Sequence, residues 1–395
     1  MRSDEASSGL VGLFHEHEEE GGVVVGRTVA VEGLLSGFSA WSERHTYAAY
    51  VPGRELARVA PRLPTGRLSV RDRAELTTSE ATFAAWHDCQ FDTRLPFLAR
   101  SKLGGAHPIT LTHHTISYKE LLHDGLLRLL LAAPRPYDSI VCTSHAARRA
   151  LAACIDAVAE ALRQSCGAQI AYQGRYDVVP LAVDCDRFRP TDRAVARARF
   201  GIPPDRFVLL WVGRLSLIDK ADLLPLVDAL GVLRERHPER ELLLVCAGRE
   251  RPTERFGGAI ADYARELGLA ECVRIMDHSE FGSVAELLYG AADVFVSPID
   301  NIQESFGLTP IEAMACGVPQ IVSDWDGYRE SVVHGETGFL LPTRWARCAD
   351  DLSGAAWFRD SPFDHLALAQ SVAVDMNALV EGVSRLIREP GLTGA

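Results

Sequence analysis

Short apolar runs rich in β-branched residues recur through the chain in two series, separated by segments with helical periodicity. The first series comprises residues 11–14, 109–113 (ITLTH), 139–144 (SIVCTS) and 176–181 (YDVVPL). The second comprises FVLLWVG, ELLLVCAG, VRIM, ADVFVSP and PQIVSD, all between residues 207 and 324. Such runs, alternating with helices such as Ala146 to Leu162, are typical of parallel strands buried on both faces. The pattern predicts an α/β fold with two doubly wound sheets.

The length of the chain also favours two domains. At 395 residues it exceeds what a single hydrophobic core usually serves. The stretch from Ala182 to Pro204 is polar and interrupted by prolines, as a linker would be. We therefore expect one domain over residues 1–190 and a second over 191–395. Residues 343–374 resemble an insertion before a final helix from Asp375 to Arg388, and no function follows from them.

Charge and composition exclude several classes of partner. The net charge of −12 disfavours nucleic acid and general adhesion to anionic lipid. No apolar run reaches membrane-spanning length, and the first twenty residues lack the basic and apolar parts of a signal peptide. Nine cysteines are scattered singly, which favours free thiols in a reducing compartment. We expect a cytoplasmic protein without an integral membrane segment, and peripheral attachment to a membrane stays open.

Two carboxylates stand eight residues apart around the predicted start of a short helix, at Glu304 and Glu312. Thr309 is a good N-cap, Pro310 suits the first helical position, and Gly317 is a natural stop. The free main-chain N–H groups at such a helix start can bind phosphate or other oxygen-rich groups. This arrangement suits an extended ligand such as a sugar nucleotide, with each glutamate reaching a different part of it.

The same residues have a purely structural interpretation. Thr309 and Glu312 have the spacing of a capping box, in which Glu312 would return to the Thr309 N–H. Taken alone, these residues favour the capping box.

The longer segment ESFGLTPIEAMACGVPQIVSDWDGYRESVVHGETGFLLP, however, resembles the donor-binding signature of retaining glycosyltransferases of family 4, the glycosyl transferases group 1. The resemblance implies the GT-B fold, in which two Rossmann-like domains face each other across a cleft. It assigns acceptor binding to the N-terminal domain and the nucleotide-sugar donor to the C-terminal domain.

The resemblance also implies roles for single residues. Glu312 would bind the ribose hydroxyls and Glu304 the hydroxyls of the transferred sugar. The segment between them would contribute further donor contacts, mainly through main-chain N–H groups, from Ser305, Phe306, Gly307 and Leu308. The base pocket is loosely assigned to Met276, Asp277 and His278.

Two cations follow the strand FVLLWVG, at Arg214 and Lys220. Cations at the carboxyl end of a strand match a diphosphate leaving group, whose negative charge grows as the glycosidic bond breaks. They resemble the family's Gly-Arg-Leu-Ser...Lys element, although the spacing is one residue longer than usual and makes Lys220 the less certain of the two. A solvated charged turn is the alternative.

Two further candidates come from the N-terminal half. Gly21 and Gly22 follow the first strand, where a main chain without side chains can approach phosphate or sugar closely. His114 follows ITLTH and matches the family histidine that reaches the donor sugar, although His113 could take that role. A histidine bonded to the main chain at a strand end is the alternative.

No cofactor or metal is expected. Asp184–Asp186 and Asp324–Asp326 have the Asp-x-Asp form that metal-dependent glycosyltransferases of another fold use, but here they fall in a linker and in the PQIVSD loop. Arg214 and Lys220 can supply the positive charge that a metal would. The acidic residues around His15 and His17 indicate a solvated loop.

The sequence therefore predicts a metal-independent retaining hexosyltransferase that moves a sugar from a nucleoside diphosphate to an acceptor. The acceptor, a glycan, a lipid-linked sugar or a small molecule, leaves no readable motif in residues 52–108. Two alternatives stay open: a GT-B nucleotide-sugar epimerase, and a catalytically silent GT-B subunit that binds a nucleotide sugar or a partner transferase. The chain ends at REPGLTGA, where many relatives continue into helices that cross back onto the N-terminal domain. For this reason the catalytically silent subunit stays an alternative.

Overall fold

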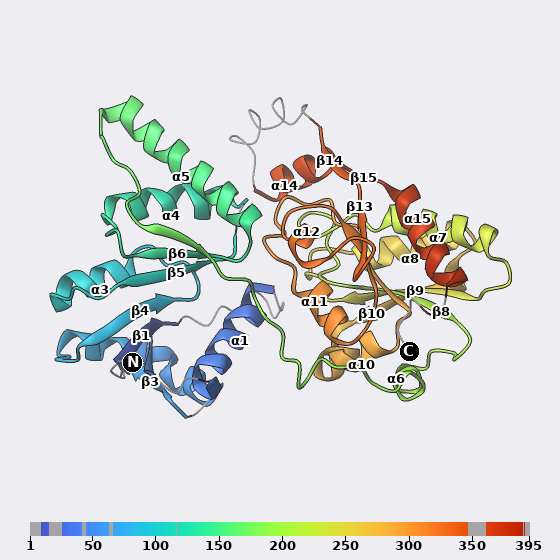
Figure 1. Ribbon diagram of the computed structural model, residues 1–395, viewed down its shortest axis with the longest axis horizontal. Coiled ribbons are helices and arrows are strands. Elements are labelled where there is room, and N and C mark those ends of the chain that lie inside the picture. Colours follow the sequence, from blue (N-terminus) through green and yellow to red (C-terminus); the bar gives the residue numbers. More distant parts are fainter. Residues whose placement is uncertain are drawn as a thin grey trace, which may run out of the picture. The chain divides into compact units, whose positions relative to one another are not determined.

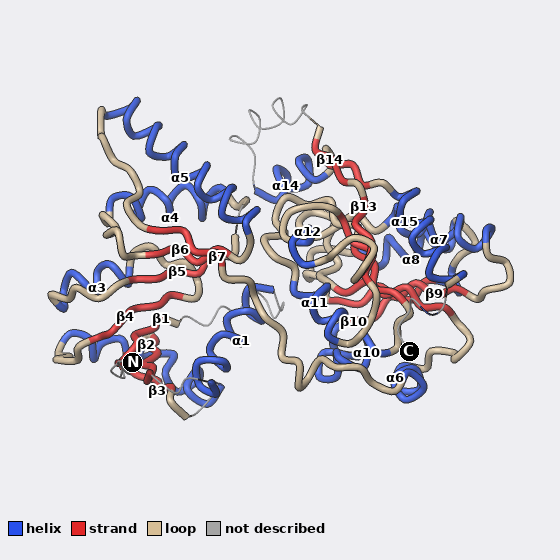
Figure 2. The backbone as a smooth tube through the Cα atoms, viewed as in Figure 1, coloured by secondary structure: helices blue, strands red, loops and turns tan. Residues whose placement is uncertain are grey.

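The computed structural model describes residues 9–15, 26–41, 45–62, 66–115, 117–346, 361–389 and 391. Contacts divide the chain into two compact units, Met1–Leu181 and Ala182–Ala395. Each unit contains its own parallel sheet with helices around it (Figures 1 and 2). The boundary predicted from the sequence follows residue 190, whereas contacts group residues 182–190 with the second unit.

The first unit contains a seven-stranded sheet in the order β3-β2-β1-β4-β5-β6-β7, in which every neighbouring pair is parallel. Its strands are β1 (Gly9–Phe14), β2 (His45–Val51), β3 (Leu68–Asp72), β4 (Phe83–Asp88), β5 (Ile109–His113), β6 (Ser139–Cys142) and β7 (Arg175–Val178). The strand order reverses between β1 and β4. In open α/β sheets, ligands bind beyond the carboxyl ends of the strands at such a reversal.

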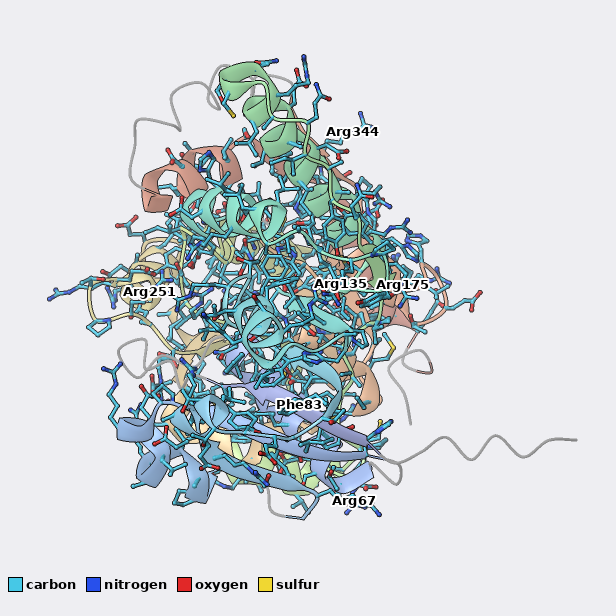
Figure 3. All side chains as sticks on the ribbon, turned by 90° about the vertical axis from the view of Figure 1, so that its left-hand side faces the viewer. Arg67, Phe83, Arg135, Arg175, Arg251 and Arg344 are labelled. Carbon is cyan, nitrogen blue, oxygen red and sulfur yellow. The ribbon has the colours of Figure 1, made fainter. Side chains whose placement is uncertain are left out.

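Among the described residues, the helices that accompany this sheet are α1 (Gly26–Trp41), α2 (Leu56–Val59), α3 (Leu95–Leu103), α4 (Lys119–Leu131) and α5 (His145–Cys166). Helices α4 and α5 lie side by side (Figure 1). The core under them is aromatic: Trp86 stacks on Tyr50 and packs against Phe83, which is labelled in Figure 3. Such clusters dominate the apolar area that a core buries.

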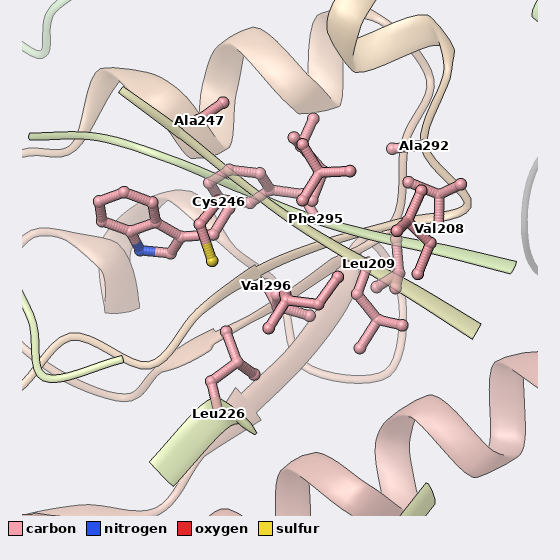
Figure 4. Close-up of a cluster of buried hydrophobic side chains, with 14 of the residues drawn as sticks. Val208, Leu209, Leu226, Cys246, Ala247, Ala292, Phe295 and Val296 are labelled. Atoms are coloured by element: carbon pink, nitrogen blue, oxygen red, sulfur yellow. The ribbon is translucent and has the colours of Figure 1, made fainter. Parts of the chain in front are cut away.

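The second unit contains a six-stranded parallel sheet in the order β10-β9-β8-β11-β12-β13. Its strands are β8 (Phe207–Val212), β9 (Leu242–Gly248), β10 (Val273–Asp277), β11 (Val294–Ser297), β12 (Gln320–Ser323) and β13 (Gly338–Leu341). The side chains of β8, β9 and β11 are almost entirely buried, and Figure 4 shows part of the cluster that they form. The order reverses between β8 and β11, which makes this the expected ligand-binding edge.

The helices described in the second unit are α6 (Arg193–Phe200), α7 (Leu224–Arg236), α8 (Phe256–Glu266), α9 (His278–Phe281), α10 (Ala285–Gly290), α11 (Leu308–Ala315), α12 (Tyr328–Ser331), α14 (Ser361–Ala369) and α15 (Met376–Arg388). The final helix α15 follows an N-cap at Asp375 and lies against α7 (Figure 1). In the predicted insertion, β14 (Thr343–Trp345) pairs antiparallel with β15 (Val372–Val374).

The predicted α/β class with two doubly wound sheets is confirmed. All the runs named from the sequence contain strands: the run 109–113 coincides with β5, and each of the others has at least one end shifted by a residue or more. Strands β2, β3, β4, β13, β14 and β15 were not predicted. Among the described helices, none combines the length and the apolar character that crossing a bilayer demands.

The linker prediction needs a correction, because α6 lies inside the stretch from Ala182 to Pro204. Asp192 caps this helix by accepting hydrogen bonds from the N–H groups of Ala194 and Val195. Arg197 Nη2 then donates to Asp293 Oδ2 over 2.6 Å, and Arg193 Nη1 donates to Asp293 Oδ1 over 2.8 Å. Polar residues of the stretch 182–204 therefore belong in part to a helix whose arginines form ion pairs with Asp293, just before β11.

The Asp293 carboxylate lies just before β11 and also accepts a hydrogen bond from the Val208 N–H on β8, over 2.7 Å. It is only 6% exposed. Breaking a buried ion pair by removing one partner leaves the other charge without compensation.

We expect Asp293→Ala to lower the free energy of unfolding by about 3 to 5 kcal/mol, because Arg197 would stay buried without its anion. Urea unfolding of the full chain, followed by circular dichroism, measures this. The control is Asp262→Ala, since the Asp262–Arg265 pair is 67% exposed at both ends and should contribute little. Equal losses in the two variants would contradict the anchoring role of Asp293.

Candidate functional site

The loops that follow β8 and β11 meet at the reversal of strand order in the second unit. Lys220, from the β8 loop, donates a hydrogen bond to Glu304 Oε2, from the β11 loop. Both side chains are largely buried. Burial acts to lower the pKa of Lys220, but the Glu304 carboxylate more than offsets this, so the pKa is raised. The two residues form a buried ion pair.

Asn301 holds the same two loops together through the main chain. Its Nδ2 donates to the Lys220 carbonyl oxygen, and its Oδ1 accepts from the Gln303 N–H over 2.6 Å. Trp325, from the loop after β12, donates its indole N–H to the Asn301 carbonyl over 2.8 Å. These bonds fix Lys220 in place although the spacing from Arg214 is one residue longer than in the family element.

Arg214 also lies at this edge. Its Nη1 lies 3.2 Å from Asp219 Oδ2, and its side chain is 17% exposed. The same carboxylate oxygen accepts a hydrogen bond from Arg251 Nη2 over 2.7 Å. The alternative of a solvated charged turn is therefore wrong for Arg214 and Lys220, because both are held by carboxylates in a largely buried cluster.

Helix α11 begins two residues earlier than predicted. Its N-cap is Gly307 and its first residue is Leu308, so Thr309 is not the N-cap and Pro310 is not the first helical residue. Gly307 has a φ of 90°, and a Cβ at this position would lie 2.0 Å from Cε1 of Tyr328. Only glycine satisfies both conditions. The chain therefore enters the helix at Gly307, which brings its main chain close to Tyr328.

The residues before Gly307 are also closely packed. Phe306 is buried, and a Cβ at Gly327 would lie 2.4 Å from its Cα. The Gly327 N–H donates to the Glu304 carbonyl over 3.1 Å, and the Ser305 N–H donates to the Gln303 carbonyl over 3.2 Å. The β12 loop thus supports the main chain that carries Glu304.

Glu312 does not form the capping box. No side chain caps α11, and Glu312 Oε2 instead accepts a hydrogen bond from the hydroxyl of Tyr289, over 2.6 Å. Burial raises the pKa of Glu312, and the Tyr289 hydrogen bond only partly offsets this. The structure thus keeps a carboxylate in a place where its charge is poorly compensated, which is typical of functional sites.

In the first unit, the carboxyl ends of β4 and β5 border a cavity of about 270 Å³. His113 and His114 both line it, together with Phe91, Arg94 and Arg128. His114 Nε2 lies 3.1 Å from the Cys89 carbonyl oxygen, which is the main-chain contact that the sequence analysis kept as an alternative. His113 is 1% exposed, and both its ring nitrogens lack a hydrogen-bond partner.

Burial, with a smaller effect of His114, lowers the pKa of His113 to about 3, so its ring is neutral at physiological pH. The ring packs edge-on against Phe91, whose own φ of 63° is unusual for a bulky residue. Backbone strain and unsatisfied buried groups gather at functional sites.

The structure gives less information on the remaining residues predicted from the sequence. Gly21 and Gly22 lie outside the described residues. Asp184 accepts hydrogen bonds from the N–H groups of Asp186 and Arg187, so the first Asp-x-Asp segment is a local turn. Across the described residues, no three His, Cys, Asp or Glu side chains gather as metal ligands would.

Sequence reasoning missed Asp219, Tyr289, Tyr328 and Arg251. Asp219 carried a signal, because it directly precedes Lys220 in the loop that is one residue longer than usual. The other three touch the site only through contacts between distant segments, for which a single sequence offers no pattern.

Residues 206–354 match the family described as Glycosyl transferases group 1. The chain is 35% identical over 269 residues to the D-inositol 3-phosphate glycosyltransferase of Actinosynnema mirum, covering 66% of this chain and 60% of that protein. It is 39% identical over 174 residues to D-inositol 3-phosphate glycosyltransferase 2 of Catenulispora acidiphila, covering 42% of this chain and 39% of that protein. The chain thus spans less than two thirds of the length of both relatives.

Solved structures share the fold over nearly the whole chain. Anabaena Alr3699/HepE in complex with UDP-glucose aligns with a TM-score of 0.60 at 16% identity, covering 96% of this chain and 100% of that one. Sucrose-phosphate synthase from Thermosynechococcus elongatus aligns with a TM-score of 0.57 at 19% identity, covering 97% and 99%. The second unit of this chain thus contains the segment that matches the glycosyl transferases group 1 family, and the chain has the GT-B fold.

Proposed function

We propose that this protein is a retaining glycosyltransferase that moves a hexosyl group from a nucleoside diphosphate sugar to an acceptor without a metal. The observation that carries the proposal is the buried Lys220–Glu304 pair beside Arg214, where the strand order of the second sheet reverses. Cations for a diphosphate and a carboxylate for sugar hydroxyls are adjacent there. The structures of Anabaena Alr3699/HepE in complex with UDP and with UDP-glucose support a nucleotide-sugar donor.

The ion pair can serve both halves of the donor at once. A lysine ammonium has three N–H donors, and Glu304 uses one of them, so the others can bind phosphate oxygens. A carboxylate has two oxygens, and Glu304 can accept from a sugar hydroxyl while it keeps Lys220. Arg214 adds a second cation, and Glu312 would bind the ribose hydroxyls.

In the proposed step, the acceptor hydroxyl oxygen bonds to the anomeric carbon on the face from which the diphosphate leaves. The bond between that carbon and the phosphate oxygen breaks, its electron pair goes to the diphosphate, and the hydroxyl proton passes to a phosphate oxygen. Lys220 and Arg214 stabilise the growing negative charge. No protein nucleophile is required.

The cavity of the first unit is the proposed acceptor site, and His114 is retained as the proposed contact to the donor sugar. The neutral ring of His113 offers one donor and one acceptor, which suits a hydroxyl group. Arg94 and Arg128 are exposed where they line the cavity, and within the described residues neither forms an ion pair with a carboxylate. The acceptor we propose is a small polyol that carries an anionic group, the class to which the D-inositol 3-phosphate of the related glycosyltransferases belongs.

We expect Glu312→Gln to weaken nucleoside diphosphate binding and yet to stabilise the folded protein at pH 7. An acid whose pKa is raised by folding contributes stability below its unfolded pKa and loses it as pH rises through the folded pKa. Glutamine at position 312 does not ionise, so this loss of stability disappears. Its side-chain oxygen can still accept a hydrogen bond from the Tyr289 hydroxyl. Unfolding midpoints near pH 4 and pH 7 and calorimetry with UDP measure both effects.

The variant should unfold later than wild type at pH 7 and together with it near pH 4. Glu266→Gln, at an exposed position, serves as the control. Unchanged UDP affinity in Glu312→Gln would remove this residue from the donor site.

Arg214→Gln and Lys220→Gln should lower turnover more than donor affinity, each by about a hundredfold, because negative charge accumulates on the diphosphate only as the bond breaks. Glutamine at position 220 can still donate to Glu304, which limits structural damage. Donor hydrolysis across several nucleotide sugars, UDP-glucose among them, measures the effect. Arg240→Gln, at an exposed position before β9, is the control.

Wild type without transfer or hydrolysis of any donor would favour the silent-subunit alternative. The same assay with a chelator tests metal independence: activity lost to the chelator and restored by manganese or magnesium would contradict it.

Arg94→Gln and Arg128→Gln should each weaken binding of D-inositol 3-phosphate about tenfold or more, since a hydrogen bond to a charged group contributes about 1.5 to 3 kcal/mol. Calorimetry with D-inositol 3-phosphate, inositol and inorganic phosphate measures this. Arg163→Gln, on the exposed face of α5, is the control. Equal affinity for inositol and its phosphate would rule out the anionic contact, and no binding of any probe would remove the acceptor proposal.

A further inference from the structure

Asp219 places one carboxylate between two arginines in the second unit. Its Oδ2 lies 3.2 Å from Arg214 Nη1 and accepts a hydrogen bond from Arg251 Nη2 over 2.7 Å. The side chain of Asp219 is 2% exposed, whereas that of Arg251 is 31% exposed. A buried carboxylate that two guanidinium groups share stabilises both of them against their mutual repulsion.

The two arginines come from different loops that are closely joined. Arg214 follows β8 and Arg251 follows β9. A Cβ at Gly248 would lie 1.6 Å from the Gly213 carbonyl oxygen, and the Leu215 N–H donates to the Arg249 carbonyl over 3.0 Å. Asp219 adds a side-chain connection across the same junction.

Arg251 has a second carboxylate partner, and Arg214 has none among the ion pairs of the described residues. Arg251 Nη1 donates to Glu254 Oε1 over 2.8 Å. The charge of Arg251 is thus balanced by Glu254 as well as by Asp219, while Arg214 shares a single carboxylate and keeps further N–H groups for an anion. Lys220, the next residue after Asp219, is paired with Glu304.

We propose that Asp219 is a positioning residue for the transfer reaction: it holds the Arg214 guanidinium in the orientation that stabilises the departing diphosphate. Arg251 in turn holds the Asp219 carboxylate through its hydrogen bond. The inference rests on the proposed function of the same site. Asp219 touches no reacting atom in this role. It acts by restricting the rotamers of Arg214, since small errors in the position of a charge-stabilising group are costly in the transition state.

A positioning role for Asp219 predicts different effects of its substitution on turnover and on nucleoside diphosphate affinity. Removing the Asp219 charge makes the site more positive, so a nucleoside diphosphate should bind Asp219→Asn at least as tightly as wild type. Turnover should nevertheless fall, because Arg214 is no longer held. A residue that only supports the fold would lower thermal stability and leave the turnover of the folded fraction unchanged.

The experiment compares Asp219→Asn, Arg251→Gln and Arg214→Gln with the double variant of Asp219→Asn and Arg214→Gln in the full chain. Donor hydrolysis yields kcat and KM, calorimetry yields Kd for UDP, GDP and ADP, and the unfolding midpoint is recorded for each. We expect Asp219→Asn to lower kcat about tenfold to a hundredfold. Arg251→Gln should lower kcat less than Asp219→Asn does. In a protein that already carries Arg214→Gln, Asp219→Asn should cause no further loss of kcat. Asp262→Asn, in an exposed Asp–Arg pair, is the matched control.

Independent effects of the Asp219 and Arg214 substitutions would overturn the positioning role, as would an unchanged kcat in Asp219→Asn. If Asp219→Asn does not fold, Asp219→Glu and Arg251→Gln carry the test, because Arg251 is partly exposed and Glu keeps the charge. A wild-type protein that binds none of the three nucleotides and hydrolyses no donor would instead remove the proposed function, and the inference with it.

Discussion

The buried ion pair between Lys220 and Glu304 is the interaction on which the candidate donor site depends. Strands β8 and β11 are distant in sequence but adjacent in the sheet, and the pair joins the loops that follow them. Desolvating two charges is costly unless geometry and further hydrogen bonds compensate. Asn301 donates to the main-chain carbonyl of Lys220 and Gly327 donates to that of Glu304, so both main chains are held where the two charges meet. The loops that carry Lys220 and Glu304 therefore meet because β8 and β11 are neighbours in the sheet.

Much of the fold was predictable from sequence because a parallel sheet leaves a local signature, a short run of β-branched residues before a turn. The placement of Lys220 and Glu304 at one edge follows from the same rule. Details that depend on distant segments were not predictable. Thr309 has the chemistry of an N-cap, yet the contact between Gly307 and Tyr328 moves the start of the helix. Glu312 likewise bonds to Tyr289, which lies on another helix.

Both units place poorly satisfied polar groups at the edges where ligands are proposed to bind. His113 is buried without a partner for either ring nitrogen, and burial raises the pKa of Glu312. The buried carboxylate of Asp138, by contrast, is well compensated: it accepts hydrogen bonds from Arg100 and from the N–H groups of Arg135 and Ile109. Proteins retain such local costs where function needs them.

The anchoring of α6 by Asp293 bears on what counts as an autonomous folding unit in this chain. The segment that matches the family, residues 206–354, contains Asp293 but neither Arg197 nor α15, which covers α7. Expressed alone, that segment would hold a buried carboxylate without its cations and an apolar helix face open to water. The boundaries of recognisable sequence and of stable structure therefore differ, and a dissected second unit has to begin before Asp192 and extend through Arg388.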